Sequence, residues 1–358
     1  MLARPGGTMT NPLRIALVLG ALGAASSAAA VCTPFGNPPR PLVPDLTTTT
    51  CAGGTTLGPW PDGDGTPRRA CLWEPPGASS AGPLPLVVYV HPSLFTADTV
   101  PFATNLLAFL ATANVSGDRS RPGFILLAPE GRATAHFYPA PDDRGTGWDN
   151  WYRQLDPAGA TRVVAGVAYP ENVDAATIDH FVAEETATGK VDPRRIYVTG
   201  WSNGSAMAVL WALNRPGIAA AAVYSAPNPF RAFDDPCPQT PVAGAPRGDA
   251  EIQVFNRRVP VYHLHNDCDI AGICPNGELL RSQLRRLRTP FTDVIVDATQ
   301  TRVATCLAAC GTSPDGDLAF ADNPLGFTLG TRNHTRWPTL WTRAMLDFFR
   351  RHPLRRRR

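Results

Sequence analysis

A serine between two glycines lies near the middle of the chain, in the segment Gly200-Trp201-Ser202-Asn203-Gly204. The apolar run 196–199 precedes this segment, and the helix-forming run 205–214 follows it. A strand that turns abruptly into a helix strains the residue at the corner and crowds the positions two before and two after it; glycine relieves that crowding. The helix N-terminus also directs free N–H groups at a place where negative charge can develop. The pattern therefore predicts that Ser202 is a nucleophile.

A serine hydroxyl attacks a carbonyl at neutral pH only when a base removes its proton, and histidine is the usual base. His334 lies in a polar loop directly before the last expected helix, residues 337–350, where such a base loop is expected. Of the other histidines after Ser202, His263 and His265 lie in or at the end of an expected strand that should lead to the acid, and His352 lies in the C-terminal tail. The sequence therefore favours His334 as the general base, with a surface loop histidine as the plainer alternative.

The acid that orients such a histidine is expected between the nucleophile and the base in chain order, after the apolar strand 259–264. Asp267 and Asp269 both lie there. Asp269 lies further into the loop, where its carboxylate can reach an imidazole, so it is favoured over Asp267. Capping of a turn is the other role open to both. Asp293 and Asp297, beside the next strand, are further candidates.

Two backbone N–H groups must stabilise the oxyanion that forms when the serine attacks. Asn203, directly after the nucleophile, is expected to supply one of them. The loop after the first expected parallel strand, His91-Pro92-Ser93-Leu94, is expected to supply the other. Proline has no N–H, so Ser93 is the preferred donor and Leu94 the alternative.

Four tryptophans are candidates for an apolar or aromatic pocket that binds the acyl group: Trp148, Trp151, Trp201 and Trp337. Packing within the core or between loops is the other role open to each.

The elements that must position these residues alternate between strands and helices. Continuous apolar runs predict strands buried on both faces at 84–90, 123–128, 195–199, 220–224, 259–264 and 292–296. Apolar residues at three- and four-residue spacing, or the position between strands, predict helices at 102–112, 173–188, 205–214, 279–287 and 337–350. Residues 33–80 predict loops with two short edge strands. The alternation predicts an α/β fold with a doubly wound, mostly parallel sheet and helices on both faces.

The segment 191–208 resembles the nucleophile region of the polyhydroxybutyrate depolymerase and feruloyl esterase-like family. Residues 334–338 and 347–354 resemble that family's histidine loop and last helix, and residues 265–269 resemble its acid loop. This resemblance, which spans residues 84–354, implies an α/β-hydrolase fold and places the family's aspartate on Asp269. It also implies secretion and hydrolysis of carboxylic esters without a cofactor. Polyhydroxyalkanoate polymers or oligomers, or feruloyl and acetyl esters, are the expected substrates.

The chain departs from the family pattern at several positions near the expected site. His91-Pro92 stands where His-Gly is usual, and Trp201 and Ser205 replace a commoner leucine and glycine. The acid loop carries Asn266 and Cys268 where glycine and alanine are common. These changes indicate a divergent subgroup of the family. Two other functions stay open as alternatives: a noncatalytic secreted binding protein, because a fold does not fix a function, and a serine peptidase, because it shares the mechanism.

The N-terminus predicts a secretory signal peptide in residues 1–30. Two arginines precede the apolar run 15–22, and small residues 26–30 provide a cleavage site after Ala30. A noncleaved anchor, or lipidation at Cys32, is the alternative. The mature chain is expected to form one catalytic domain, residues 31–354, followed by a disordered basic tail, residues 355–358.

The cysteine content and the charge limit which partners the protein can have. Eight cysteines behind an export signal predict disulfides, with the connectivity open, and none has zinc-finger spacing with histidine. The leader carries two arginines and the last nine residues six, so the formal net charge of +3 becomes −5 for the body. No basic face therefore indicates nucleic acid, although the arginine tail could bind an acidic surface. The expectation is a monomer without a metal or cofactor, off the membrane after cleavage, that binds a small or polymeric ester.

Overall fold

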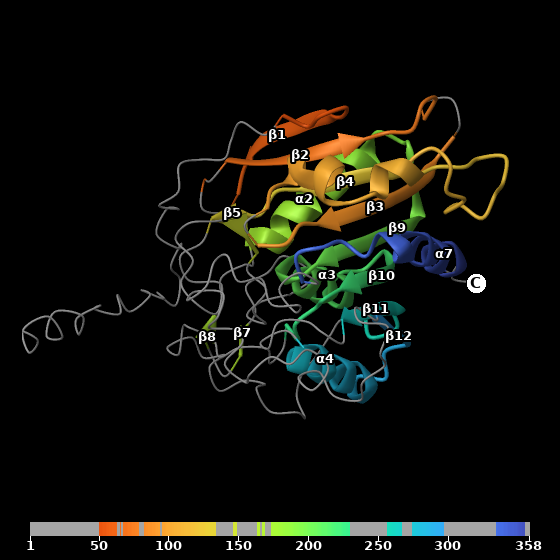
Figure 1. The fold of residues 1–358 in the computed structure, drawn as a ribbon. Coiled ribbons are helices and arrows are strands. Elements are labelled where there is room, and N and C mark those ends of the chain that lie inside the picture. The colour runs from red at the N-terminus through yellow and green to blue at the C-terminus, as the bar shows by residue number, and fades with distance from the viewer. Residues whose placement is uncertain are drawn as a thin grey trace, which may run out of the picture.

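The computed structural model describes twelve stretches of the chain: residues 50–62, 65, 67–78, 82–93, 95–133, 146–148, 163–164, 167–168, 173–229, 256–266, 274–296 and 334–354. A large sheet runs through these residues, and Figure 1 shows its strands side by side. Its eight strands are β1 (Thr55–Pro61), β2 (Pro67–Trp73), β3 (Leu84–Val90), β4 (Ile125–Pro129), β9 (Val191–Trp201), β10 (Ile218–Tyr224), β11 (Val261–Asn266) and β12 (Phe291–Val296).

The strand order in the sheet is β1-β2-β4-β3-β9-β10-β11-β12. β1 pairs antiparallel with β2, and β2 pairs antiparallel with β4, whereas the pairs from β4 to β12 are parallel. The parallel strands β3, β4 and β10 are buried along their whole length, because helices cover both faces of the sheet. This order, with an antiparallel first edge and a parallel remainder, is that of the α/β-hydrolase fold and confirms the predicted fold class.

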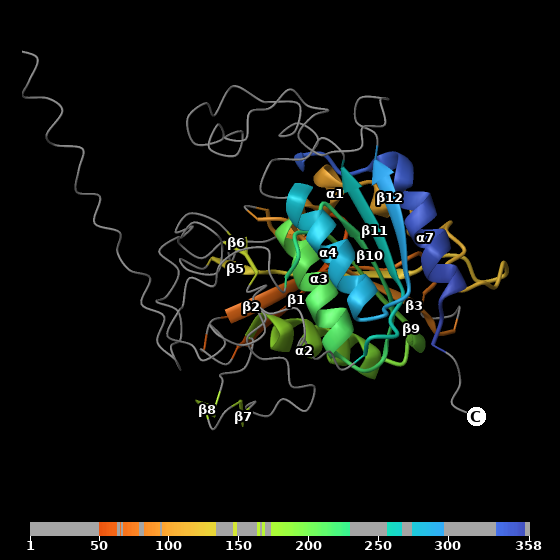
Figure 2. The ribbon, with the colours of Figure 1, turned by 90° about the horizontal axis from the view of Figure 1, so that it is seen from below.

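The helices lie on both faces of the sheet. Three of them, α2 (Val173–Ala187), α3 (Asn203–Asn214) and α4 (Cys274–Arg286), contribute to one apolar layer, whereas α7 (Thr342–Arg351) contributes to the layer on the other face. Figure 2 shows α3 and α4 on one side of the strands and α7 on the other. In the described residues, no helix is long and apolar enough to cross a membrane.

The predicted helix at 102–112 is wrong. The structure has a short helix α1 (Val100–Ala103) and a 3₁₀ turn η2 (Leu106–Phe109) instead, separated by Thr104 in an extended conformation. The hydroxyl of Thr104 donates to the carbonyl of Val100 at 2.9 Å and accepts the N–H of Leu106 at 3.3 Å. A threonine that bonds local backbone groups in this way competes with the helix, and the apolar spacing does not reveal it.

The predicted strands and the other predicted helices are present, most of them with shifted boundaries, and the largest shifts are at the beginnings of two helices. Helix α4 begins at Cys274 rather than at residue 279, and α7 begins at Thr342 after a 3₁₀ turn, η4 (Thr339–Trp341). The two strands predicted in residues 33–80 are present as β1 and β2, but of these only β1 lies at the edge of the sheet, because β2 pairs with both β1 and β4. A disulfide joins Cys71, in β2, to Cys51.

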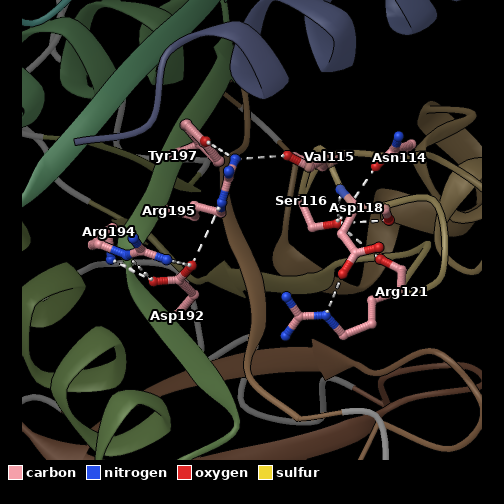
Figure 3. Close-up of polar contacts among 9 residues, drawn as sticks. All are labelled: Asn114, Val115, Ser116, Asp118, Arg121, Asp192, Arg194, Arg195 and Tyr197. Carbon is pink, nitrogen blue, oxygen red and sulfur yellow. Dashed lines mark hydrogen bonds and ion pairs between the residues drawn. The ribbon is translucent and has the colours of Figure 1, made fainter. Parts of the chain in front are cut away.

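A polar network fastens the amino end of β9, at the end of the strand opposite Ser202. Arg195 donates through Nη1 to the carbonyl of Val115 at 3.2 Å and to the hydroxyl of Tyr197 at 3.4 Å, while Arg194 pairs with Asp192 (Figure 3). The loop that Arg195 reaches is itself closed by contacts among Asn114, Ser116, Asp118 and Arg121. These contacts fix the amino end of β9, the strand whose carboxyl end leads directly into Ser202.

Candidate active site

Ser202 occupies the corner between β9 and α3, as the sequence predicts. Its φ of 55° lies in the left-handed region, which is unfavourable for a residue with a side chain, and only 2% of the residue is exposed. The two flanking glycines show why the turn needs them. A Cβ on Gly200 would lie 2.5 Å from the carbonyl oxygen of Gly204, and a Cβ on Gly204 would lie 2.2 Å from the carbonyl oxygens of both Val90 and His91.

The strained turn is pinned to the end of β10. The N–H of Ser202 donates to the carbonyl of Tyr224 at 3.0 Å. Ser205 adds two bonds with its hydroxyl, which donates to that carbonyl at 2.7 Å and accepts the Tyr224 N–H at 3.0 Å. Sequence reasoning noted Ser205 only as a departure from glycine; the structure gives it a role in holding the turn.

The imidazole of His334 lies against the Ser202 hydroxyl. The distance from Ser202 Oγ to His334 Nε2 is 2.8 Å, and 132 positions separate the two residues in the sequence. The backbone of the histidine loop is held by Trp201, whose indole N–H donates to the His334 carbonyl at 2.8 Å. A hydroxyl within hydrogen-bond reach of an imidazole can lose its proton as it attacks, so the pair has the geometry of a nucleophile and its base.

The predicted acid cannot be placed, because Asp267 and Asp269 lie outside the described residues, as does Asp297. β11, which the prediction required to lead into the acid loop, ends at Asn266. Among the candidate acids, the structure describes Asp293. Its carboxylate accepts from His263 Nδ1 and from Arg281, both at 2.9 Å, and thus has partners in β11 and α4.

Those partners also fix the charge of Asp293. Burial favours its neutral form, but the hydrogen bonds from His263 and Arg281 outweigh burial and hold the pKa of Asp293 well below its usual value. Asp293 is therefore an ionised partner of the β11 histidine. The assignment of the triad acid to Asp269 stays a prediction.

The loop that should carry the second oxyanion donor begins at His91, at the end of β3. Its imidazole Nδ1–H donates to the Pro92 carbonyl at 2.9 Å, and its Nε2 accepts the N–H of Gly131 at 2.8 Å. The ring is fully buried, and burial lowers its pKa to about 4. His91 is thus a neutral imidazole with a fixed tautomer. Ser93, the preferred donor, is half-buried in this loop, and Leu94 lies outside the described residues.

The buried His91 predicts a pH dependence of stability. Its pKa is about 4 in the fold against 6.5 normally, so the unfolded chain binds a proton between these values and the folded chain does not. The free energy of unfolding should therefore fall as the pH drops from about 6.5 to about 4, by on the order of 3 kcal/mol. His91→Gln, which cannot be protonated but can accept from Gly131, should flatten this fall. Urea titrations of both proteins at pH 7 and pH 4.5 measure the difference; equal falls would contradict the prediction.

Three of the four candidate pocket tryptophans are described, and all three are at most 5% exposed: Trp148, Trp201 and Trp337. Each indole N–H has a partner in the protein: the His91 carbonyl for Trp148, the His334 carbonyl for Trp201 and the Thr342 hydroxyl for Trp337. Trp151 lies outside the described residues. That these side chains line a substrate pocket stays a prediction. The indoles of Trp148 and Trp201 join distant segments near Ser202, whereas that of Trp337 bonds within its own segment.

No family model matches the chain, and no curated protein matches its sequence. Solved structures with a similar chain path include an S-formylglutathione hydrolase from Agrobacterium tumefaciens, 12% identical over 85% of this chain and 97% of that chain, with a TM-score of 0.47. A ferulic acid esterase is 13% identical over 68% of this chain and 88% of that one, with a TM-score of 0.45. A carboxylesterase from Bacillus cereus is 15% identical over 66% and 88%, with a TM-score of 0.38. Similarity at this level assigns no activity.

Proposed function

We propose that this protein is a serine carboxylesterase that works through an acyl-enzyme intermediate. The observation that carries the proposal is the 2.8 Å contact between Ser202 Oγ and His334 Nε2, at a strained turn where a helix begins. As Ser202 Oγ attacks the ester carbonyl, His334 Nε2 takes the hydroxyl proton. The imidazolium then gives this proton to the leaving alcohol as the ester C–O bond breaks.

Deacylation repeats these steps with water. His334 takes a proton from the water molecule, the hydroxide adds to the acyl carbon, and the proton returns to Ser202 Oγ as the carboxylic acid leaves. In both acylation and deacylation, the negative oxygen of the tetrahedral intermediate would accept hydrogen bonds from the backbone N–H groups of Asn203 and Ser93. One such donor lowers a barrier of this kind by roughly 3 kcal/mol. Asp269 is the proposed partner of His334 Nδ1.

The proposed substrates are polyhydroxyalkanoate polymers or oligomers, with feruloyl and acetyl esters as the second class. The resemblance of residues 191–208 and of the histidine loop supports this choice. Secretion is part of the proposal: the predicted signal peptide supports it, and so does the Cys51–Cys71 disulfide, because disulfides persist in oxidising compartments.

The proposal is tested by the release of 3-hydroxybutyrate from a suspension of amorphous polyhydroxybutyrate, beside hydrolysis of p-nitrophenyl butyrate and methyl ferulate. A fluorophosphonate probe should label the protein, and hydrolysis of an ester should far exceed that of the matching amide. Release of 3-hydroxybutyrate would identify a depolymerase, and activity on the ferulate alone would identify the second class. A folded protein that the probe does not label and that cleaves no ester would contradict the proposal and favour a noncatalytic binding protein. Faster cleavage of the amide would identify a peptidase.

A further inference from the structure

Trp148 connects two segments that lie far apart in the sequence and close to Ser202. Its backbone N–H donates to Asn203 Oδ1 at 2.8 Å, and Asn203 Nδ2 donates to the Trp148 carbonyl at 3.3 Å. Its indole N–H donates to the carbonyl of His91 at 2.9 Å. One buried residue thus bonds the position directly after the nucleophile and the position at which the oxyanion loop begins.

These two positions belong to the two halves of the proposed oxyanion hole. The N–H of Asn203 is one expected donor, and Ser93, two residues after His91, carries the other. Gly204 brings the same two segments into close contact, since a Cβ there would overlap the carbonyls of Val90 and His91. That contact limits only how near the segments can come. The bonds of Trp148 to both sides also limit how far apart they can move.

Trp148 is itself held from a third side. It directly follows β6 (Thr146–Gly147), which pairs with β5 (Arg132–Ala133), and the N–H of Gly131 just before β5 donates to His91 Nε2 at 2.8 Å. The Trp148 and His91 rings are in contact, with their centroids 5.0 Å apart. The contacts therefore form a closed ring, which we call the Trp148 bracket: the His91 imidazole bonds Gly131, the β5–β6 pair leads to Trp148, and the Trp148 indole bonds the His91 carbonyl.

We infer that Trp148 is a positioning residue for the oxyanion hole, which sets the spacing between its two donors without touching the substrate. The inference rests on the proposed esterase function. A group that is 1% exposed and bonded at its N–H, its carbonyl and its indole contributes through the residues it holds. A small displacement of an oxyanion donor affects the transition state more than the bound ester, because the negative charge appears only in the transition state.

The test compares Trp148→Phe with the matched control Trp211→Phe. Trp211 is also 1% exposed, and its indole N–H also has an acceptor, Asp179 Oδ1 at 2.8 Å. It lies near the carboxyl end of α3, however, and this bond joins α3 to α2 rather than to the segments that carry the proposed oxyanion donors. Both variants lose one buried indole bond. Trp148→Phe should lower kcat about ten- to a hundredfold with KM within about twofold, as expected for a misplaced oxyanion donor. Trp211→Phe should leave kcat within about twofold at a similar loss of stability.

A second readout separates positioning from general loosening. A trifluoromethyl ketone forms a tetrahedral adduct with the serine and places its oxyanion in the hole, so its affinity should fall with kcat in Trp148→Phe and stay unchanged in Trp211→Phe. Asn203→Ala removes the bracket from its other side and should reproduce the kcat loss, which keeps the test open if Trp148→Phe does not fold. An active wild type with kcat and ketone affinity unchanged in the folded Trp148 or Asn203 variant, or with an equal kcat loss in the control, overturns this inference alone. A wild type that cleaves no ester overturns the proposed function and the inference together.

Discussion

Replacing Ser202 with alanine is expected to lower kcat/KM for an ester by about 10⁴- to 10⁶-fold, while the protein stays folded. The alanine side chain is smaller than that of serine and fits in its place. The turn keeps the bond from the N–H of residue 202 to the Tyr224 carbonyl, because that bond does not involve the side chain. The attacking oxygen is lost, so no acyl-enzyme can form. The measurement is kcat/KM with p-nitrophenyl butyrate, together with fluorophosphonate labelling, which should disappear.

His334 provides the control for this prediction, because the nucleophile and its base act as a unit. His334→Ala alone should cost about as much as Ser202→Ala, and the double variant should be no slower than Ser202→Ala. Losses that multiply in the double variant would show that the 2.8 Å contact between these side chains is not used in the reaction. Residual activity near that of the wild type in Ser202→Ala would mean that another residue is the nucleophile.

The parts of the site that the sequence predicted are those whose signals are local. A strand, a glycine, a serine, a second glycine and a helix follow one another within residues 191–214, and the structure shows each in that order. The histidine loop was found in the same way, from a polar segment before the last helix. Chain order then decided between His334 and the histidines of β11, and the contact with Ser202 agrees with that choice.

The bracket around Trp148 gave no such signal. Its bonds join residues 57 and 55 positions apart, to the carbonyl of His91 and the side chain of Asn203. No periodicity links such positions, and the sequence around Trp148 does not distinguish a residue that lines a pocket from one that joins two loops. Ser205 was missed for a related reason, because its partners are backbone groups of the next strand. The false helix at 102–112 differs, since there the apolar spacing was right and a single threonine hydroxyl interrupted the helix.

The tight approach of the nucleophile turn to β3 leads to the second large effect, a loss of folding stability in Gly204→Ala. A Cβ at this position would lie 2.2 Å from two backbone carbonyl oxygens, and backbone atoms of a buried strand cannot move aside as a flexible side chain can. Overpacking of this kind costs upwards of about 3 kcal/mol. Urea unfolding monitored by circular dichroism measures the loss.

Gly277→Ala is the matched control, because Gly277 also lies in a helix, α4, and an added Cβ there would meet its nearest neighbours at 3.7 Å, an ordinary contact distance. Alanine is a better helix former than glycine by about 1 kcal/mol, so this variant should be as stable as the wild type or more so. The two substitutions differ chiefly in the space they meet. Gly204→Ala should also lose activity in whatever fraction still folds, because the clash can be relieved only by moving α3 away from β3, which carries Ser202 away from His334 and separates the two oxyanion donors. Equal stability and equal activity in the two variants would mean that the turn does not contact β3 as closely as its geometry indicates.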